Sequence, residues 1–225
     1  MYLSQLTLNP THPQARRDLA SAYEMHRSLV RAFAAGNGDT PGRFLWRLER
    51  GTAGAREAMV LVQAAQPGRW QALSERSGYL LRLQPDKPVA TDRLVRLGEP
   101  CRFRLLANPN VKRDGKRHGL KDDVERQAWL RRQGERHGFD LLAADCNGRE
   151  RLRVGQGSRD RLITLDAVCY EGILQPTDAA ALAQALLVGI GPGKALGLGM
   201  LSLARIQMLS ALPSLPARQT AAAVS

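Results

Sequence analysis

The sequence predicts an α+β protein built from two consecutive units, each with the element order β-α-β-β-α-β. Strand-like and helix-like hydrophobic periods alternate in this order along both halves, and a stretch rich in proline and charge separates them near residues 85–100. The 225 residues suffice for two domains of roughly 100 residues each. This order is that of tandem ferredoxin-like (βαββαβ, RRM-like) domains, predicted here at residues 1–90 and 91–211, with a disordered tail at residues 212–225.

The first half supplies one complete set of elements. Alternation over Met1–Leu8 predicts a strand that ends at Asn9-Pro10. Pro13 opens a helix that the apolar spacing extends as one segment to about residue 35. The later patterns predict strands at residues 44–48 and 59–64 joined by a turn at 51–54, a short helix at 70–75 and a strand at 79–83.

The second half repeats the order. The patterns predict a strand at residues 101–107, a helix at 122–137, strands at 139–146 and 162–174, a helix at 178–188 and a strand at 200–208. Asp178 follows Pro176-Thr177 and is a good N-cap for the Ala- and Leu-rich helix.

The charge balance favours a polyanionic partner. The chain has 33 Lys and Arg residues against 21 Asp and Glu residues, a net charge of +12, and 16 of the basic residues fall between Arg102 and Arg161. Such a concentration attracts phosphates, because screening confines each charge to its neighbourhood. With 44% hydrophobic and 24% charged residues, the composition excludes wholesale disorder.

Several other classes are excluded. The opening MYLSQLTLNP has no basic segment before an apolar core, so no secretory signal is expected, and no apolar run is long enough to span a membrane. Three widely spaced cysteines form no C-x-x-C pair, and four scattered histidines accompany no carboxylate cluster. We therefore expect a cytoplasmic protein without a metal, a cofactor or a membrane partner.

Tyr23 and His26 are the first candidate for chemistry. Residues three apart share a helix face, so the phenol and the imidazole can meet one ligand. A histidine near neutrality can exchange a proton with a hydroxyl or a leaving oxygen. Arg27 and Arg31, four apart on an adjoining face, could hold a phosphate. The alternative interpretation is that His26 simply borders the apolar stripe of its helix.

A glycine-rich stretch at residues 189–199 is the second candidate. Five glycines in eleven residues surround Lys194. The spacing fits neither a P-loop nor a dinucleotide fingerprint. A bare backbone of this kind allows a close approach by another chain and can turn its N–H groups toward phosphates. A flexible connection without a function is the alternative.

The third candidate is a basic region in two pieces. The first, residues 108–121, carries Lys112, Arg113, Lys116, Arg117, His118 and Lys121, and the second, residues 149–161, carries Arg149, Arg151, Arg153, Arg159 and Arg161 around a predicted hairpin turn. Only 5% of the residues are aromatic, and no stacking strand of the RRM type is present. These features favour a folded or double-stranded RNA, recognised through its shape and phosphates.

Four segments occur together in one order: MYLSQLTLNP, Y-x-x-H-R-S-L-V-x-A-F from Tyr23, N-P-x-V-K-R-D-G-K-R-H-G-L from Asn108, and G-P-G-K-A-L-G-L-G-M-L-S-L from Gly191. With them the chain resembles, over essentially its whole length, the CasE family of CRISPR RNA endoribonucleases from type I-E Cascade. The resemblance implies tandem ferredoxin-like domains that bind a CRISPR repeat stem-loop, cut it once at the 3′ base of the stem and keep the product as a Cascade subunit.

The resemblance also assigns residues. Tyr23 and His26 match the family's active-site tyrosine and histidine, and the loop with Gly191, Gly193 and Lys194 matches its glycine-rich RNA-contacting loop. The arginine hairpin around Arg153–Arg161 corresponds to the arm that grips the stem, and Arg27 and Arg31 to further RNA contacts. The expected partners are CRISPR repeat RNA and the other Cascade subunits.

Cleavage of RNA without a metal fits these residues. The 2′-hydroxyl attacks the adjacent phosphorus in line and leaves a 2′,3′-cyclic phosphate and a 5′-hydroxyl. His26 would act as acid or base, Tyr23 would orient the groups, and Lys194 or an arginine would stabilise the charge. Two alternatives stay open: a non-catalytic RNA-binding subunit of a ribonucleoprotein, and a small-molecule enzyme whose basicity is incidental.

Overall fold

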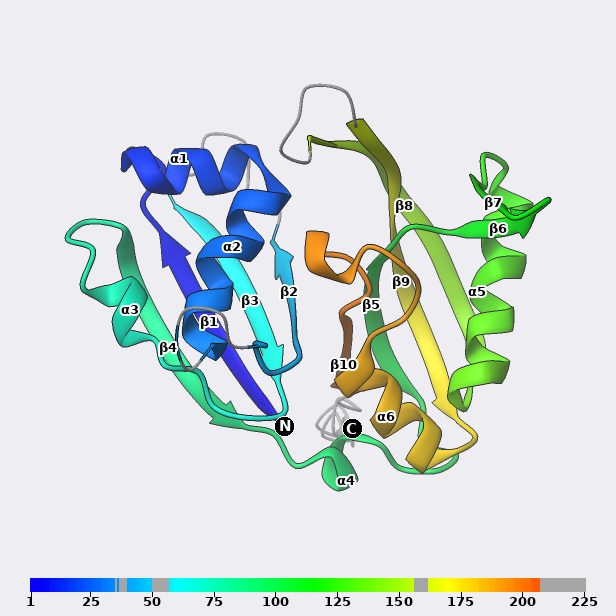
Figure 1. Cartoon of the computed structure of the whole chain (residues 1–225). Helices are drawn as coiled ribbons and strands as arrows, with labels where there is room; N and C mark the ends of the chain where they lie inside the picture. Colours follow the sequence, from blue (N-terminus) through cyan, green and yellow to red (C-terminus); the bar gives the residue numbers. More distant parts are fainter. Residues whose placement is uncertain (35, 37–39, 50–56, 156–161, 207–225) are drawn as a thin grey trace, which may run out of the picture.

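The first half of the chain forms a four-stranded antiparallel sheet with its helices packed on one face (Figure 1). The computed structural model describes residues 1–34, 36, 40–49, 57–155 and 162–206. The elements are β1 (Tyr2–Leu8), α1 (Pro13–Ala20), α2 (Ala22–Phe33), β2 (Phe44–Leu48), β3 (Ala58–Ala64), α3 (Gln71–Ser74) and β4 (Leu80–Pro88). The strand order is β2-β3-β1-β4, in which the first and third strands of the unit lie at the centre of the sheet.

The second half repeats this topology after a short connecting helix. Its elements are α4 (Thr91–Leu94), β5 (Cys101–Ala107), β6 (Asn110–Arg113), β7 (Lys116–Gly119), α5 (Asp123–His137), β8 (Phe139–Gly155), β9 (Leu162–Pro176), α6 (Ala179–Val188), the 3-10 turn η1 (Lys194–Leu196) and β10 (Leu201–Arg205). The main sheet has the order β10-β5-β9-β8, and β6 and β7 pair separately as a hairpin. The predicted fold class of two tandem ferredoxin-like units is confirmed.

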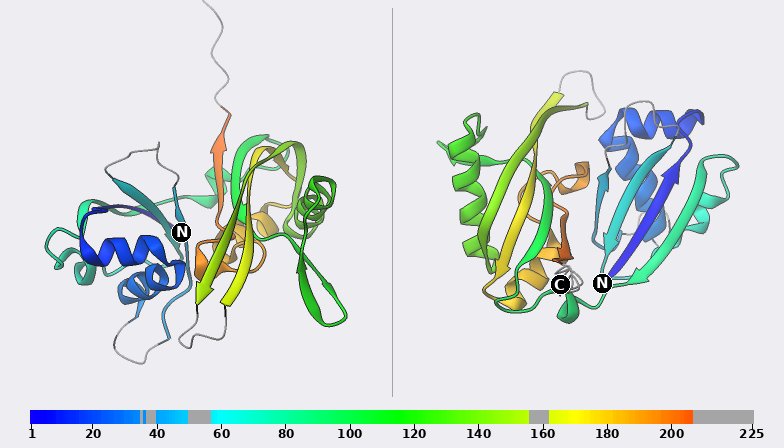
Figure 2. Two further views of the ribbon diagram at one scale, coloured as in Figure 1. Left: turned by 90° about the horizontal axis from the view of Figure 1, so that it is seen from above. Right: turned by 180° about the vertical axis from the view of Figure 1, so that it is seen from behind.

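Each half has its own apolar core between its sheet and its helices. In the first half, alternate residues of β1 and β3, such as Leu6 and Val60, pack against Met25 and Leu29 of α2. In the second half, the corresponding core includes Leu105, Tyr170, Leu130 of α5 and Leu182 of α6. Because successive strand residues point to opposite faces, each sheet has one face covered by helices and one that carries none. In the rear view of Figure 2 the strands of both sheets lie toward the viewer.

Buried polar contacts join the two halves. Arg47 of β2 is only 3% exposed and donates a hydrogen bond to the carbonyl of Met200 at 3.2 Å. Its guanidinium also pairs with Glu49 at 2.6 Å, and Glu49 accepts a hydrogen bond from Arg104 of β5 at 2.6 Å. Gln63 of β3 donates to the carbonyl of Leu186 in α6. Since a buried guanidinium is tolerated only when it is paired, these contacts fix how the halves meet.

The single helix predicted for residues 13–35 is wrong. Ser21 adopts an extended backbone (φ −142°, ψ 114°) and divides the segment into α1 and α2. Its hydroxyl accepts a hydrogen bond from the backbone N–H of Glu24 at 3.4 Å, so Ser21 is a new N-cap. The break places Tyr23 and His26 near the start of α2 instead of in the middle of a long helix.

Other predicted boundaries also change. The last strand of the first half does not end at residue 83 but continues to Pro88, because β4 is an edge strand and tolerates its prolines there. The sequence patterns do not predict α4, the β6–β7 hairpin or η1. The turn at residues 51–54 and the tail at residues 212–225 lie outside the described residues.

Candidate active site and nucleic-acid interface

The helix α2 positions the two residues predicted to carry chemistry. Its N-cap is Ser21, and Glu24 in its first turn complements the positive end of the helix dipole. Met25 and Leu29 are buried against the sheet. This packing leaves Tyr23 and His26 half-buried at the border of that face, while Arg27 and Arg31 on the next face are exposed.

The imidazole ring of His26 packs against aromatic side chains. Its ring stacks on Phe44 of β2 with 5.2 Å between the centroids and 22° between the planes, and Phe44 stacks in turn on Phe33. Nδ1 is buried and has no hydrogen-bond partner among the described residues, so Nε2 is the ring nitrogen that can meet a ligand. Burial lowers the pKa of His26, which favours the neutral imidazole that can accept a proton.

Tyr23 and Arg27 contact one another on the same helix. The Arg27 guanidinium carbon lies 5.9 Å from the centroid of the Tyr23 ring, and the guanidinium also pairs with Glu24 at 3.2 Å. Arg31, one turn further along, forms no ion pair within the described part of the chain. Arg31 is therefore the less neutralised of the two arginines that the sequence predicted as RNA contacts.

The glycine-rich stretch of the second half lies against α2 and β2 of the first. Trp46 of β2 donates a hydrogen bond from Nε1 to the carbonyl of Ala195 at 3.4 Å. Gly197 has a φ of +80°, and a Cβ at this position would lie 2.9 Å from the Trp46 ring. Both the backbone conformation and the close approach therefore require glycine. Through this contact, Trp46 places η1 beside the helix of His26.

Lys194 opens η1 and is partly buried there. Burial, and then the charge of Arg43, lower the pKa of its ammonium group. Among the described residues it has no acidic partner, so its positive charge is not neutralised within the described part of the chain. Gly191 and Gly193 have positive φ values of 78° and 88°, and they pack against Trp129 and Leu198. Packing alone accounts for both glycines, and their predicted RNA contact remains a prediction.

The arm formed by β8 and β9 carries the second basic piece. Arg149 and Arg151 of β8 face Asp166 of β9, at 3.2 Å and 3.6 Å. Arg153 is the register partner of Thr164, but its side chain lies outside the described residues, as do Arg159 and Arg161 entirely. Of the arginines predicted on this arm, the described structure therefore places the side chains of Arg149 and Arg151.

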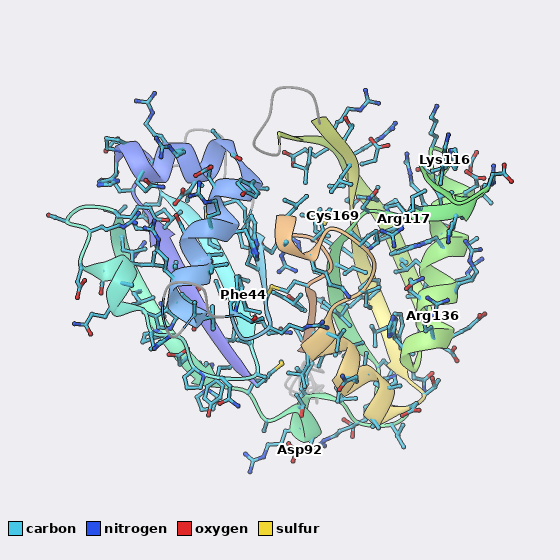
Figure 3. All side chains as sticks on the ribbon, in the orientation of Figure 1. Phe44, Asp92, Lys116, Arg117, Arg136 and Cys169 are labelled. Carbon is cyan, nitrogen blue, oxygen red and sulfur yellow. The ribbon has the colours of Figure 1, made fainter. Side chains whose placement is uncertain are left out.

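The β6–β7 hairpin carries the first basic piece. Lys112, Arg113, Lys116 and Arg117 are all exposed, and Arg113 lies 3.7 Å from Glu125 of α5. In Figure 3, Lys116 and Arg117 lie beside α5, far from Phe44 and hence from the ring of His26 that stacks on it. The structure thus does not bring the predicted basic residues to one point. A ligand that touches both the hairpin and α2 must be extended, as an RNA stem is.

The residues that support the site carry no signal in the sequence. Phe44, Trp46 and Asp166 were predicted only as members of strands. Their contacts join parts of the chain that are far apart, such as Trp46 and Ala195, and no local pattern encodes such pairs. Within the described ranges, no group of three or more His, Cys, Asp and Glu residues could hold a metal ion. No described helix is long and apolar enough to cross a membrane.

Comparison with known proteins finds relatives over most of the chain. Residues 1–205 match the model of a family described as CRISPR associated protein. The CRISPR-associated endoribonuclease Cse3 of Thermus thermophilus is 39% identical over 216 residues, which are 91% of this chain and 100% of that protein. The CRISPR system Cascade subunit CasE of Escherichia coli is 29% identical over 91% of this chain and 99% of its own length.

A solved structure extends the comparison to the backbone. A CRISPR endoribonuclease Cse3 bound to a 19-nucleotide RNA matches with a TM-score of 0.81 and 38% identity, over 91% of this chain and 100% of that one. At this level of identity and coverage, the similarity includes both halves and their arrangement.

Proposed function

This chain belongs to the family of CRISPR-associated proteins, and on that premise we propose that it is an endoribonuclease that cuts CRISPR repeat RNA. One observation carries the proposal: His26, with one nitrogen free to meet a ligand, lies on the helix against which the Lys194 turn packs. Phosphodiester cleavage by an internal hydroxyl requires a base and a cation near one phosphate, and the neighbouring elements α2 and η1 carry one of each. The relatives named Cse3 and CasE support the same function.

In the proposed reaction, Nε2 of His26 takes the proton of the 2′-hydroxyl next to the scissile phosphate. The resulting oxygen attacks the phosphorus, the bond to the 5′-oxygen breaks, and the products carry a 2′,3′-cyclic phosphate and a 5′-hydroxyl. The lowered pKa of His26 keeps the imidazole in its accepting form before RNA binds. The step takes both its nucleophile and its base from the RNA and the protein, so it needs no metal ion.

Tyr23 and Lys194 have supporting roles in this reaction. Tyr23, three residues before His26, reaches the same ligand and donates or relays a proton toward the leaving oxygen. Lys194 lies on a turn that packs against α2, and it stabilises the negative charge that grows on the phosphoryl oxygens. Arg27 and Arg31 contact the phosphates on either side of the cut.

The two predicted domains have different roles in this reaction. Residues 1–90 carry the reacting groups, and residues 91–211 hold the RNA stem with the β6–β7 hairpin, the β8–β9 arm and the glycine-rich turn at Gly191 and Gly193. The basic residues on these elements contact phosphates, which fixes the position of the duplex without reading its bases. The lower end of the stem, where the cut is made, then lies at α2.

We also infer that the protein works in the cytoplasm as a subunit of Cascade. A stem held by many cationic contacts leaves slowly, so the enzyme keeps its product and carries it into the complex. The name of the Escherichia coli relative, a Cascade subunit, supports this assignment.

The proposal is tested with labelled repeat RNA in the presence of EDTA. The wild-type chain should cut once, and His26→Ala should lower the cleavage rate by about 10²- to 10⁴-fold, the range for removal of a general base. Binding should stay within about threefold, since His26 supplies no net charge to hold phosphates. The matched control is His12→Asn, because asparagine can replace the N-cap that His12 provides for α1.

Two outcomes would contradict the proposal. If the wild-type chain returned the repeat RNA uncut with and without EDTA, the protein would be a non-catalytic RNA-binding subunit. If His26→Ala lost binding and cleavage equally, His26 would be a structural residue.

A further inference from the structure

Asp166 of β9 lies among the cations of the β8–β9 arm. Its side chain is 16% exposed, with one oxygen, Oδ2, 3.2 Å from Arg149 and the other, Oδ1, 3.6 Å from Arg151. Oδ1 is buried and accepts no hydrogen bond from the described residues. The carboxylate is thus held mainly by the charges of the two arginines, and its hydrogen-bonding capacity is only partly used.

The same carboxylate touches the other basic element. A Cβ placed on Gly119, the last residue of β7, would lie 3.1 Å from Oδ2 of Asp166. A side chain at position 119 would therefore crowd the carboxylate, and glycine lets the hairpin approach it. Asp166 is in this way an anion between two cationic elements, the β8–β9 arm and the hairpin that carries Lys112, Arg113, Lys116 and Arg117.

We propose that Asp166 determines how selectively the β8–β9 arm and the β6–β7 hairpin bind RNA. Asp166 holds Arg149 and Arg151 in place and competes with phosphates for them. The proposal rests on the RNA-binding function proposed above. A phosphate that approaches either arginine must replace part of its interaction with Asp166. An RNA whose shape engages the hairpin and the arm together gains enough contacts to offset that loss. An RNA that engages only some of the cations does not, and it binds more weakly than the positive charge alone would predict.

Glu171 offers a matched control on the same strand. It pairs with Arg104 at 3.0 Å. Asp166 and Glu171 are five residues apart in β9, so their side chains point to opposite faces of the sheet. Asp166→Asn and Glu171→Gln each remove one negative charge and change the net charge equally. Only Asp166→Asn releases Arg149 and Arg151.

The experiment compares two RNAs, the repeat stem-loop and an unrelated hairpin of the same length. Their dissociation constants are measured over a salt series for the wild-type full-length chain, Asp166→Asn and Glu171→Gln. Asp166→Asn should bind the unrelated hairpin about three- to tenfold more tightly, with a salt dependence steeper by about one phosphate contact. Its affinity for the repeat should change less, so that the preference for the repeat falls. Glu171→Gln should keep the wild-type preference.

An unchanged preference in Asp166→Asn, or an equal loss of preference in Glu171→Gln, would overturn the inference. A second test does not depend on the folding of Asp166→Asn. Arg149→Gln should weaken the binding of the unrelated hairpin less than Lys116→Gln does, because Arg149 is already paired and Lys116 has no acidic partner in the described ranges. Equal losses would overturn it as well.

Failure of the underlying function looks different. A wild-type chain that bound both RNAs equally would contradict the proposed function, and this inference with it. If the inference alone is wrong, the wild-type chain remains selective and only the variants depart from expectation.

Discussion

At the scale of single residues, the environment of His26 decides which chemistry is open to it. The stacked Phe44 ring and the buried Nδ1 remove water from one side of the imidazole, and Nε2 is left to meet a ligand. Desolvation disfavours the charged form, so His26 would begin the proposed reaction as a base. In an exposed histidine, only a neighbouring group could lower the pKa of the imidazole in the same way.

The pKa of His26 gives the first prediction at this scale. In the free protein, an NMR titration of the His26 ring protons should have its midpoint below the ordinary value of about 6.5. Phe44→Leu keeps most of the apolar volume but admits more water, so the midpoint should move toward the ordinary value. A midpoint above the ordinary value in the wild-type chain would show that a negative group, not burial, controls this histidine.

The residue-scale part of the site was only partly predictable. The spacing of Tyr23 and His26 already indicated a shared face, because helix geometry is local. The partner of the imidazole was not indicated, since Phe44 lies eighteen positions further along the sequence and on a strand. The division of the predicted helix at Ser21 was not indicated either. A serine can continue a helix or cap a new one, and the sequence pattern is compatible with both.

At the scale of elements, the glycine-rich turn is one of the contacts by which the second half reaches the helix of His26. It fits because the Trp46 indole covers Gly197 and holds the carbonyl of Ala195. The sequence predicted an unusual loop here from its five glycines, but not its neighbour. Trp46 and Gly197 meet only because β2 of the first half packs against η1 of the second.

Substitution of Gly197 tests the role of this turn. Gly197→Ala places a Cβ against Trp46 and also strains a residue with φ of +80°. We expect single-turnover cleavage to slow about tenfold or more, because small displacements of catalytic groups have large effects on rate. RNA affinity should change less than the rate.

Gly98→Ala is the matched control for this substitution. Gly98 has a similar φ of +75°, and its nearest neighbour, Gln175, is 4.0 Å from the Cβ position. Both variants carry the same backbone strain of about 1 kcal/mol, but only Gly197→Ala displaces the turn. If both variants cut RNA at the same rate, the contact of Gly197 with the Trp46 ring would have no part in positioning Lys194.

At the scale of the whole molecule, function depends on how the two halves are joined. The buried Arg47 and its partner Glu49 connect β2 to Arg104 of β5. Through these pairs, the half that carries His26 is fixed against the half that carries the basic elements. Cleavage at one position relative to a stem requires this fixed distance.

Removal of Glu49 measures the strength of the connection. Glu49→Gln leaves Arg47 buried beside a neutral amide, and we expect a loss of about 2–4 kcal/mol in the free energy of unfolding, measured by urea denaturation. The control is Glu57→Gln, whose partner Arg82 is 65% exposed. That pair should contribute less than about 1 kcal/mol. Equal losses in both variants would show that the ion pairs between the halves contribute no more to the free energy of unfolding than an exposed pair does.

The repeated element order predicted the topology of both sheets, because each unit follows from local patterns and known connections. It could not predict the relation between the halves. The contacts that set it, from Arg47 to Met200 and from Gln63 to Leu186, join residues more than a hundred positions apart. The strand β4 shows the same limit, since its prolines indicated a linker, and only its place at the sheet edge permits them.

In the proposed reaction, the RNA supplies its own nucleophile beside His26. The decisive experiment uses a repeat RNA with one 2′-deoxy substitution at the nucleotide before the scissile phosphate, incubated with the wild-type chain in EDTA. We expect this RNA to bind as the unmodified one does but to stay uncut, while the unmodified RNA yields a 2′,3′-cyclic phosphate end. Cleavage of the deoxy RNA at the normal position and rate would contradict the proposed reaction.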